Sequence, residues 1–161
     1  MKNLEDLFEQ QLKDLYSAES QLVIAIPKMV KAAHDSQLKK AFENHLEETK
    51  NHKKKLEEIC RELSIKPTGE ECKAMKGLVK EAESMIDEKA DPEVKDAGLI
   101  AEAQRVEHYE ISGYGTVVRF AKELGHDRIA KKLQETLDEE YNADQKLGDL
   151  AERRLNVKAK S

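Results

Sequence analysis

The stretch FENHLEETKNH, residues 42–52, decides the fold of this chain, because it puts charged side chains on the inward face of a predicted helix. That helix covers about residues 37–63, and steps of three or four residues from Leu38 define its inward face. The face carries Ala41, His45, Glu48, His52, Leu56, Ile59 and Leu63. Burying an ionised carboxylate without a partner costs of the order of several kcal/mol. The sequence therefore predicts that other residues compensate for the acid in the middle of this face.

The composition favours long amphipathic helices in a single domain covering residues 1–161. Charged residues make up 38% of the chain, and seven glycines and three prolines are too few for a turn-rich β protein. A chain of 161 residues can bury one sizeable core. We therefore predict an all-α fold whose outer helix faces are heavily charged.

Charge and hydropathy argue against several classes of partner. The net charge of −5 and the lack of a basic block argue against nucleic acid. No segment approaches the ~20 apolar residues of a membrane span, and the first ten residues do not resemble a signal peptide. We therefore expect a cytoplasmic protein in which Cys60 and Cys72 are reduced and structural.

Three further long helices are predicted, and acids interrupt the apolar stripe of each one. They cover about residues 4–33, 92–124 and 127–155. The interrupting acids are Glu19 in the first of these helices, Glu107 and Glu110 in the second, and Glu140 and Asp144 in the third. All four long helices thus share one irregularity.

The two halves of the chain resemble each other at an offset of 92 residues, which pairs His34-Asp35 with His126-Asp127. Each half reads as a helical hairpin, over residues 4–63 and 93–155. Residues 64–92 form a crossover that contains a shorter amphipathic helix. We therefore predict a four-helix bundle of two antiparallel hairpins.

The spacing of the acids places them at one depth in this bundle. Glu19 and Glu48 lie 15 and 14 residues from the turn at His34, and Glu110 and Glu140 each lie 15 residues from Gly125. At 1.5 Å per residue, all four are about 22 Å from their turns. Two hairpins packed face to face would gather them into one layer, with the other inward acids and histidines one turn away.

A pair of metal ions would balance these buried charges, since no lysine or arginine occupies the inward stripes near the layer. Carboxylates with one or two imidazoles suit iron or manganese. The candidate ligands are Glu19, His45, Glu48, His52, Glu107, Glu110, Glu140 and Asp144. Glu48 is the best candidate for a bridging carboxylate, and at least one of the two histidines is expected to be a ligand. The alternative is a protonated or water-filled polar layer around satisfied core histidines.

Two tyrosines are candidates for supporting roles at the layer. Tyr114 lies in the stripe one turn from Glu110, and Tyr16 lies one turn before Glu19. Each hydroxyl could bond to a ligand or supply one electron. The alternative role for Tyr114 is core packing.

Four motifs resemble the YciE/YciF ferritin-like family of bacterial proteins. They are LYSAE at 15–19, HLEET at 45–49, QRVEHYEISGYGT at 104–116 and LDEEYNADQKL at 137–147. The resemblance covers nearly the whole chain. It implies a rubrerythrin/ferritin-type four-helix bundle, a di-metal site, a homodimer and a link to stress responses. Leu7 and Leu78, on outer faces, offer surface for such a dimer.

The chain departs from the wider ferritin-like pattern, which uses Glu-x-x-His on two helices. Here Asn51 follows Glu48 at that spacing, and Ala143 follows Glu140. The site is therefore expected to be richer in oxygen ligands than usual, or to hold one metal firmly and one loosely.

Three classes of function remain open: a di-iron or di-manganese oxidoreductase acting on peroxide or oxygen, a metal-sequestering protein without turnover, and a helical interaction module whose metal is only structural. The chain has no C-x-x-C pair for an electron-transfer centre, so a redox cycle would need an external reductant.

Overall fold

A computed structural model describes residues 1–160 and confirms the all-α fold. The elements in chain order are α1 (Leu4–Ala32), α2 (Ser36–Glu62), α3 (Lys73–Asp87), α4 (Pro92–Glu123), α5 (Asp127–Leu150), a π-helical turn (Ala151–Leu155) and α6 (Asn156–Ala159). Within residues 1–160 there is no β-strand. No helix in this range combines the length and the apolar character that crossing a membrane requires.

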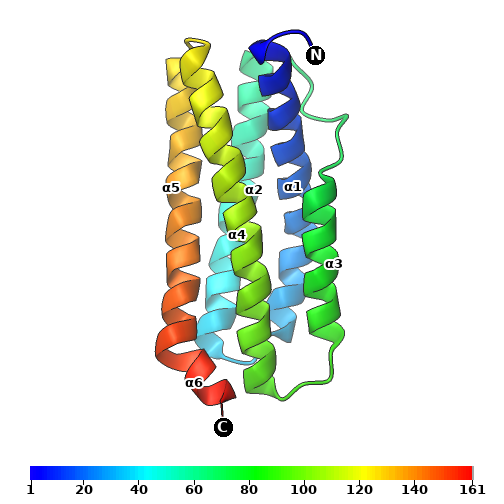
Figure 1. Cartoon of the computed structure of the whole chain (residues 1–161), viewed down its shortest axis with the longest axis vertical. Helices are drawn as coiled ribbons and strands as arrows, with labels where there is room; N and C mark the ends of the chain where they lie inside the picture. Colours follow the sequence, from blue (N-terminus) through cyan, green and yellow to red (C-terminus); the bar gives the residue numbers. More distant parts are fainter. Residues whose placement is uncertain (161) are drawn as a thin grey trace.

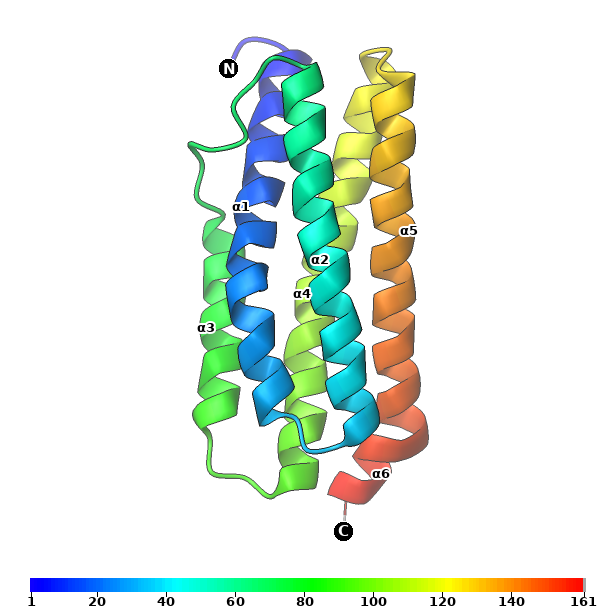
Figure 2. The same cartoon turned by 180° about the vertical axis from the view of Figure 1, so that it is seen from behind.

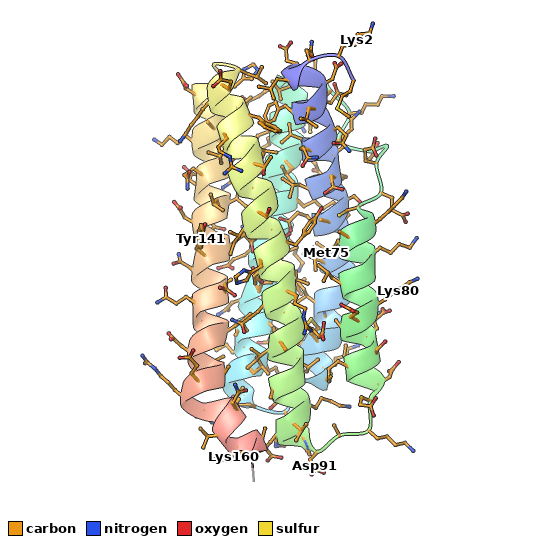
Figure 3. All side chains as sticks on the ribbon, in the orientation of Figure 1. Lys2, Met75, Lys80, Asp91, Tyr141 and Lys160 are labelled. Carbon is orange, nitrogen blue, oxygen red and sulfur yellow. The ribbon has the colours of Figure 1, made fainter. Side chains whose placement is uncertain are left out.

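The four long helices form a bundle of two antiparallel hairpins, α1 with α2 and α4 with α5 (Figure 1). The crossover is also present: α3 runs along the outside of the bundle and packs against α1 and α4, as the view from behind shows (Figure 2). Charged side chains such as Lys80 project from the outer faces (Figure 3). This arrangement turns the interrupted stripes of the four long helices toward one another.

The turn between α1 and α2 is fixed by two buried aspartates. Asp35 caps α2, and its Oδ1 accepts hydrogen bonds from the backbone N–H groups of Gln37 and Leu38 at 2.9 and 3.2 Å. Asp96 of α4 is 1% exposed and accepts bonds from the N–H groups of His34 and Asp35 at 2.7 and 2.8 Å. The first hairpin is therefore tied to the start of α4.

The turn between α4 and α5 contains Gly125, which was predicted to end the helix before it. Its φ of +76° lies in the left-handed region, which glycine adopts without strain. The N–H of His126 then bonds to the carbonyl of Ala121 at 2.8 Å, which closes the end of α4. This turn leaves Glu110 of α4 and Glu140 of α5 side by side.

The last helix differs from its predicted end at residue 155. Regular α-helix stops at Leu150, and one π-helical turn follows. This turn brings Arg154 Nε to 3.0 Å from Asp35 Oδ2, so the C-terminal segment packs against the first turn.

The apolar core consists of two clusters of buried side chains. One includes Leu22, Ile26, Leu99 and Leu147, at the end of the bundle near the α1–α2 turn. The other includes Leu12, Leu56, Val117 and Leu133, at the opposite end. The acidic layer lies between these clusters along the helices.

Candidate metal centre

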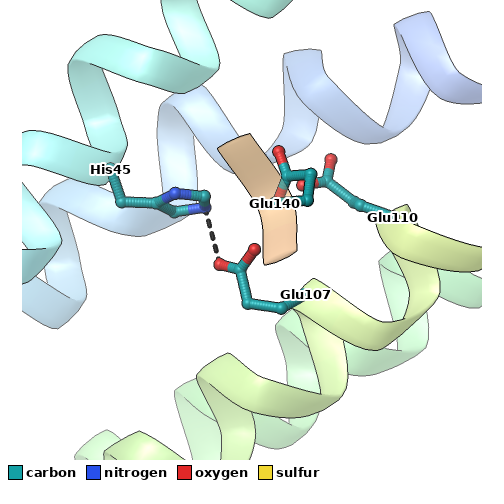
Figure 4. Close-up of side chains that lie close together, drawn as sticks. All are labelled: His45, Glu107, Glu110 and Glu140. Atoms are coloured by element: carbon teal, nitrogen blue, oxygen red, sulfur yellow. Dashed lines mark ion pairs between the residues drawn. The ribbon is translucent and has the colours of Figure 1, made fainter. Parts of the chain in front are cut away.

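Six of the predicted ligands meet in two overlapping groups in the middle of the bundle. One donor atom each of His45, Glu107, Glu110 and Glu140 lie within 4.8 Å of one another, and so do one donor atom each of Glu19, His52 and Glu140. Figure 4 shows the first group, with the carboxylates of Glu110 and Glu140 side by side. Glu140 belongs to both groups, which makes it the shared carboxylate of the layer.

The four glutamates of this layer are almost completely buried, with exposures of 0% for Glu19, Glu110 and Glu140 and 1% for Glu107. Within residues 1–160, the basic side chains paired with them are histidines alone. Both oxygens of Glu110, and Oε2 of Glu19 and of Glu107, have no hydrogen-bond partner. Buried polar atoms are normally bonded, so these oxygens point to a missing partner.

His52 is held between the layer and α5. Its Nε2 lies 2.6 Å from Glu139 Oε2, and its Nδ1 lies 3.0 Å from Glu140 Oε1 and 3.4 Å from Glu19 Oε1. Neither of these two contacts of Nδ1 is a hydrogen bond. A carboxylate on the outer nitrogen of an imidazole is the usual support of a metal-ligating histidine. Sequence reasoning missed Glu139, because it lies beside the stripe rather than in it.

His45 has a similar arrangement on the other side of the layer. Its Nε2 lies 2.9 Å from Glu107 Oε1, and its Nδ1 lies 3.5 Å from Glu48 Oε2. Glu48 thus faces the outer nitrogen of this imidazole.

The structure does not bring Glu48 or Asp144 into either group, and Glu140, rather than the predicted Glu48, belongs to both. Successive side chains of a helix point about 100° apart. Thr49 is fully buried and points into the bundle. Its neighbour Glu48 therefore lies at the rim, with 33% of its side chain exposed. Asp144 instead accepts one hydrogen bond from Gln104 and faces His108 at 3.1 Å. Glu140 occupies the shared position.

Of the two candidate tyrosines, only Tyr114 contacts the layer. It is 1% exposed, and its hydroxyl donates to Glu19 Oε1 at 2.6 Å. The hydroxyl of Tyr16 donates instead to Glu57 at 2.9 Å. Tyr141 is 55% exposed and points away from the bundle (Figure 3).

Burial and mutual repulsion raise the pKa of two glutamates of the layer, Glu110 and Glu140. Burial raises the pKa of Glu110 well above its usual value, and Glu140, Glu19 and Glu107 raise it further. Burial and Glu107 likewise raise the pKa of Glu140 to about 7. For His52, burial lowers the pKa, but Glu140 and Glu19 outweigh it and raise the value to about 10.

The residues of this layer fit a pair of metal ions. Four carboxylates and two imidazoles are an oxygen-rich donor set that suits iron or manganese. Two divalent ions would cancel the four carboxylate charges and satisfy the unpartnered oxygens. Glu140 could contact both ions, with His45, Glu107 and Glu110 on one side and Glu19 and His52 on the other.

In metal-free protein, raising the pH should destabilise the fold. The raised pKa of Glu140, about 7, means that the folded chain holds this proton more tightly than the unfolded chain, and the same holds for His52. The stability from Glu140 is present below its ordinary pKa and is lost as the pH rises through 7, and that from His52 is lost toward pH 10. We expect the free energy of unfolding to fall by an amount of the order of 3 kcal/mol between pH 5 and pH 8, measured by urea denaturation with a chelator present. Glu140→Gln should flatten this slope, and stability that rises with pH would contradict the prediction.

Known proteins resemble this chain over nearly its full length. The family described as a domain of unknown function, DUF892, matches residues 3–160. Protein YciF of Escherichia coli strain K12 is 44% identical over 162 residues, which cover 100% of this chain and 98% of YciF. The crystal structure of that stress protein superimposes with a TM-score of 0.93 and covers 97% of this chain and 99% of the YciF chain.

Two further solved structures share the fold. The Rhodopseudomonas palustris protein YcfI is 43% identical with a TM-score of 0.89, covering 92% of this chain and 94% of its own. A Xanthomonas campestris protein at 20% identity and a TM-score of 0.79, covering 96% and 95%, shows the fold alone. The match over residues 3–160 and the identity to YciF show that this chain belongs to the DUF892 family.

Proposed function

We propose that this chain is a di-metal carboxylate protein that binds two iron or manganese ions in the buried layer. One observation carries the proposal: two groups of donor atoms share Glu140, and the oxygens of Glu110 beside it are buried without partners. A polar layer that stayed metal-free would keep four carboxylates in mutual repulsion, which natural cores avoid.

We further propose that the loaded protein removes peroxide or dioxygen in the cytoplasm during stress. A pair of ferrous ions can supply the two electrons that reduce one hydrogen peroxide, with two protons, to two water molecules. The stress-protein name of YciF supports this role. An external reductant would return the ferric ions to the ferrous state.

The chain itself would orient the ligands and handle protons around the metals. Glu139 and Glu48 hold the outer nitrogens of His52 and His45. The hydroxyl of Tyr114 donates to Glu19 at 2.6 Å, so it would hold a proton beside the carboxylate layer. Two apolar clusters exclude bulk water from both ends.

Metal binding should depend on Glu140 far more than on Glu48. Glu140→Ala removes the shared carboxylate, so it should lower bound iron from about two ions to well below half of that value. Glu48→Ala removes only the carboxylate that faces Nδ1 of His45, and it should weaken the affinity by about 10- to 100-fold while sites still fill at excess metal. Mass spectrometry of native protein after anaerobic ferrous loading measures both.

The matched control is Glu47→Ala, since Glu47 is 68% exposed on the same helix. Iron should also raise the melting temperature of the wild type and of the control but not that of Glu140→Ala. A wild type that takes up no iron or manganese would overturn the metal proposal. Loss of both ions in Glu48→Ala alone would restore Glu48 as the central ligand.

The peroxide reaction should consume two ferrous ions for each peroxide. Stopped-flow absorbance should show ferrous protein reacting faster than free ferrous ion, and Glu140→Ala should react no faster than the free ion. Wild-type protein that binds two irons without accelerating the reaction would leave sequestration as the function. If bound metal stabilises the protein but neither exchanges with free metal nor changes its oxidation state, the result would instead favour a helical interaction module with a structural metal.

We also propose a homodimer, as the family resemblance suggests. Leu78 packs partly against the core, so it offers less surface than its sequence position suggested. Exposed Ile24 (69%) and Val157 (65%) are further apolar surface that a second copy could cover. Sedimentation at micromolar concentration should give twice the monomer mass of 18.3 kDa, and a monomer at all concentrations would exclude the dimer.

A further inference from the structure

An apolar cavity of about 50 Å³ lies next to the layer, between its His45 side and the surface. Apolar side chains dominate its lining, among them Ile26, Phe42 and Val106, while His45 and Glu107 of the layer form part of its wall. A water-sized group needs about 10–15 Å³ by this measure, so the cavity has room for about four such groups. Apolar side chains outnumber the polar ones in its lining, which favours an occupant with an alkyl part.

A surface groove of about 760 Å³ adjoins this cavity, and both are lined by Ala41, Asn44 and Lys146. The groove is rich in positive charge, with Lys40, Lys146, Arg153 and Arg154 against one acid, Asp149. Within residues 1–160, Arg154 is paired with Asp35, but Lys40, Lys146 and Arg153 are exposed and make no ion pair. Such a concentration of cations stands out in a chain with a net charge of −5.

We propose that this cavity and groove bind a short aliphatic carboxylate, with its tail in the cavity and its carboxylate near Lys146. Charge complementarity selects the head group, because the unpaired cations at the groove favour an anion and disfavour a cation. The apolar lining selects an alkyl tail of about four carbons.

Glu48 also lines the cavity, and its negative charge would repel a bound carboxylate. Its carboxylate lies 3.5 Å from His45 Nδ1, and its charge faces that imidazole. The head group of the ligand would instead sit outward, where Asn44 and Lys146 line both spaces. A bound tail would end against His45 and Glu107, at the edge of the proposed metal centre.

The test uses the metal-free full chain and the carboxylate series from ethanoate to octanoate, titrated by calorimetry or by NMR chemical shifts. Each methylene that enters the cavity should tighten binding about fourfold, up to about four tail carbons, after which the affinity should level off. Pentanol should bind about tenfold more weakly than pentanoate, and pentylammonium more weakly still. Intermolecular NOEs should connect the pentanoate methyl group to Phe42 and Ile26.

Two variants distinguish the contribution of the alkyl tail to binding from that of the carboxylate head group. Ala41→Leu fills the opening and should abolish binding, whereas Ala101→Leu, at an exposed position of α4, should leave it unchanged. Lys146→Glu should weaken pentanoate about tenfold without weakening pentanol. Since these measurements need no metal, failure of the metal proposal would leave them unaffected.

Absence of saturable pentanoate binding to the wild type, or equal binding of pentanol and pentylammonium, would overturn the proposal. Unchanged binding in Lys146→Glu would overturn the role of the groove. Sedimentation of Lys146→Glu provides a further check: if the variant turns a dimer into monomers, the groove is the face between two copies and the ligand assignment fails.

Discussion

The rest of this structure depends on one constraint, the burial of four glutamate carboxylates in one layer. Among residues 1–160, no lysine or arginine pairs with them. Carboxylates at this depth repel one another and lose their hydration, which is why the pKa values of Glu110 and Glu140 are raised. A core designed for stability alone would place apolar residues there. The chain instead keeps an apolar cluster on each side and brings one or two acids from each of three long helices to the same level.

The remaining features of the bundle serve this layer. Two histidines come from α2, and each has a carboxylate on its outer nitrogen, Glu139 for His52 and Glu48 for His45. Asp96 ties the turn between α1 and α2 to α4. This contact sets the position of the first hairpin along the bundle axis relative to the second. The site therefore includes the side chains that orient the donor residues as well as the donor residues themselves.

Helix periodicity and the distance to each turn predicted the bundle, the crossover and most of the layer, since both depend on backbone geometry alone. The same reasoning put Glu48 and Asp144 among the inward ligands, whereas the structure keeps both outside the two groups, because a stripe read in steps of three and four covers an arc of about 100° around the helix. Thr49 rather than Glu48 points inward, and Asp144 is drawn to Gln104 at the surface. Glu139 could not be assigned from its own helix, since its role comes from the position of His52 across the bundle.

The central claim is that this layer is a di-metal site centred on Glu140. Anomalous diffraction from crystals grown with manganese or anaerobic ferrous iron, recorded on both sides of the metal absorption edge, tests it most directly. The account predicts two anomalous peaks inside the bundle, one near His45, Glu107 and Glu110 and one near Glu19 and His52, with Glu140 touching both. A layer without anomalous signal at saturating metal, its carboxylates bonded to one another or to water, would contradict it.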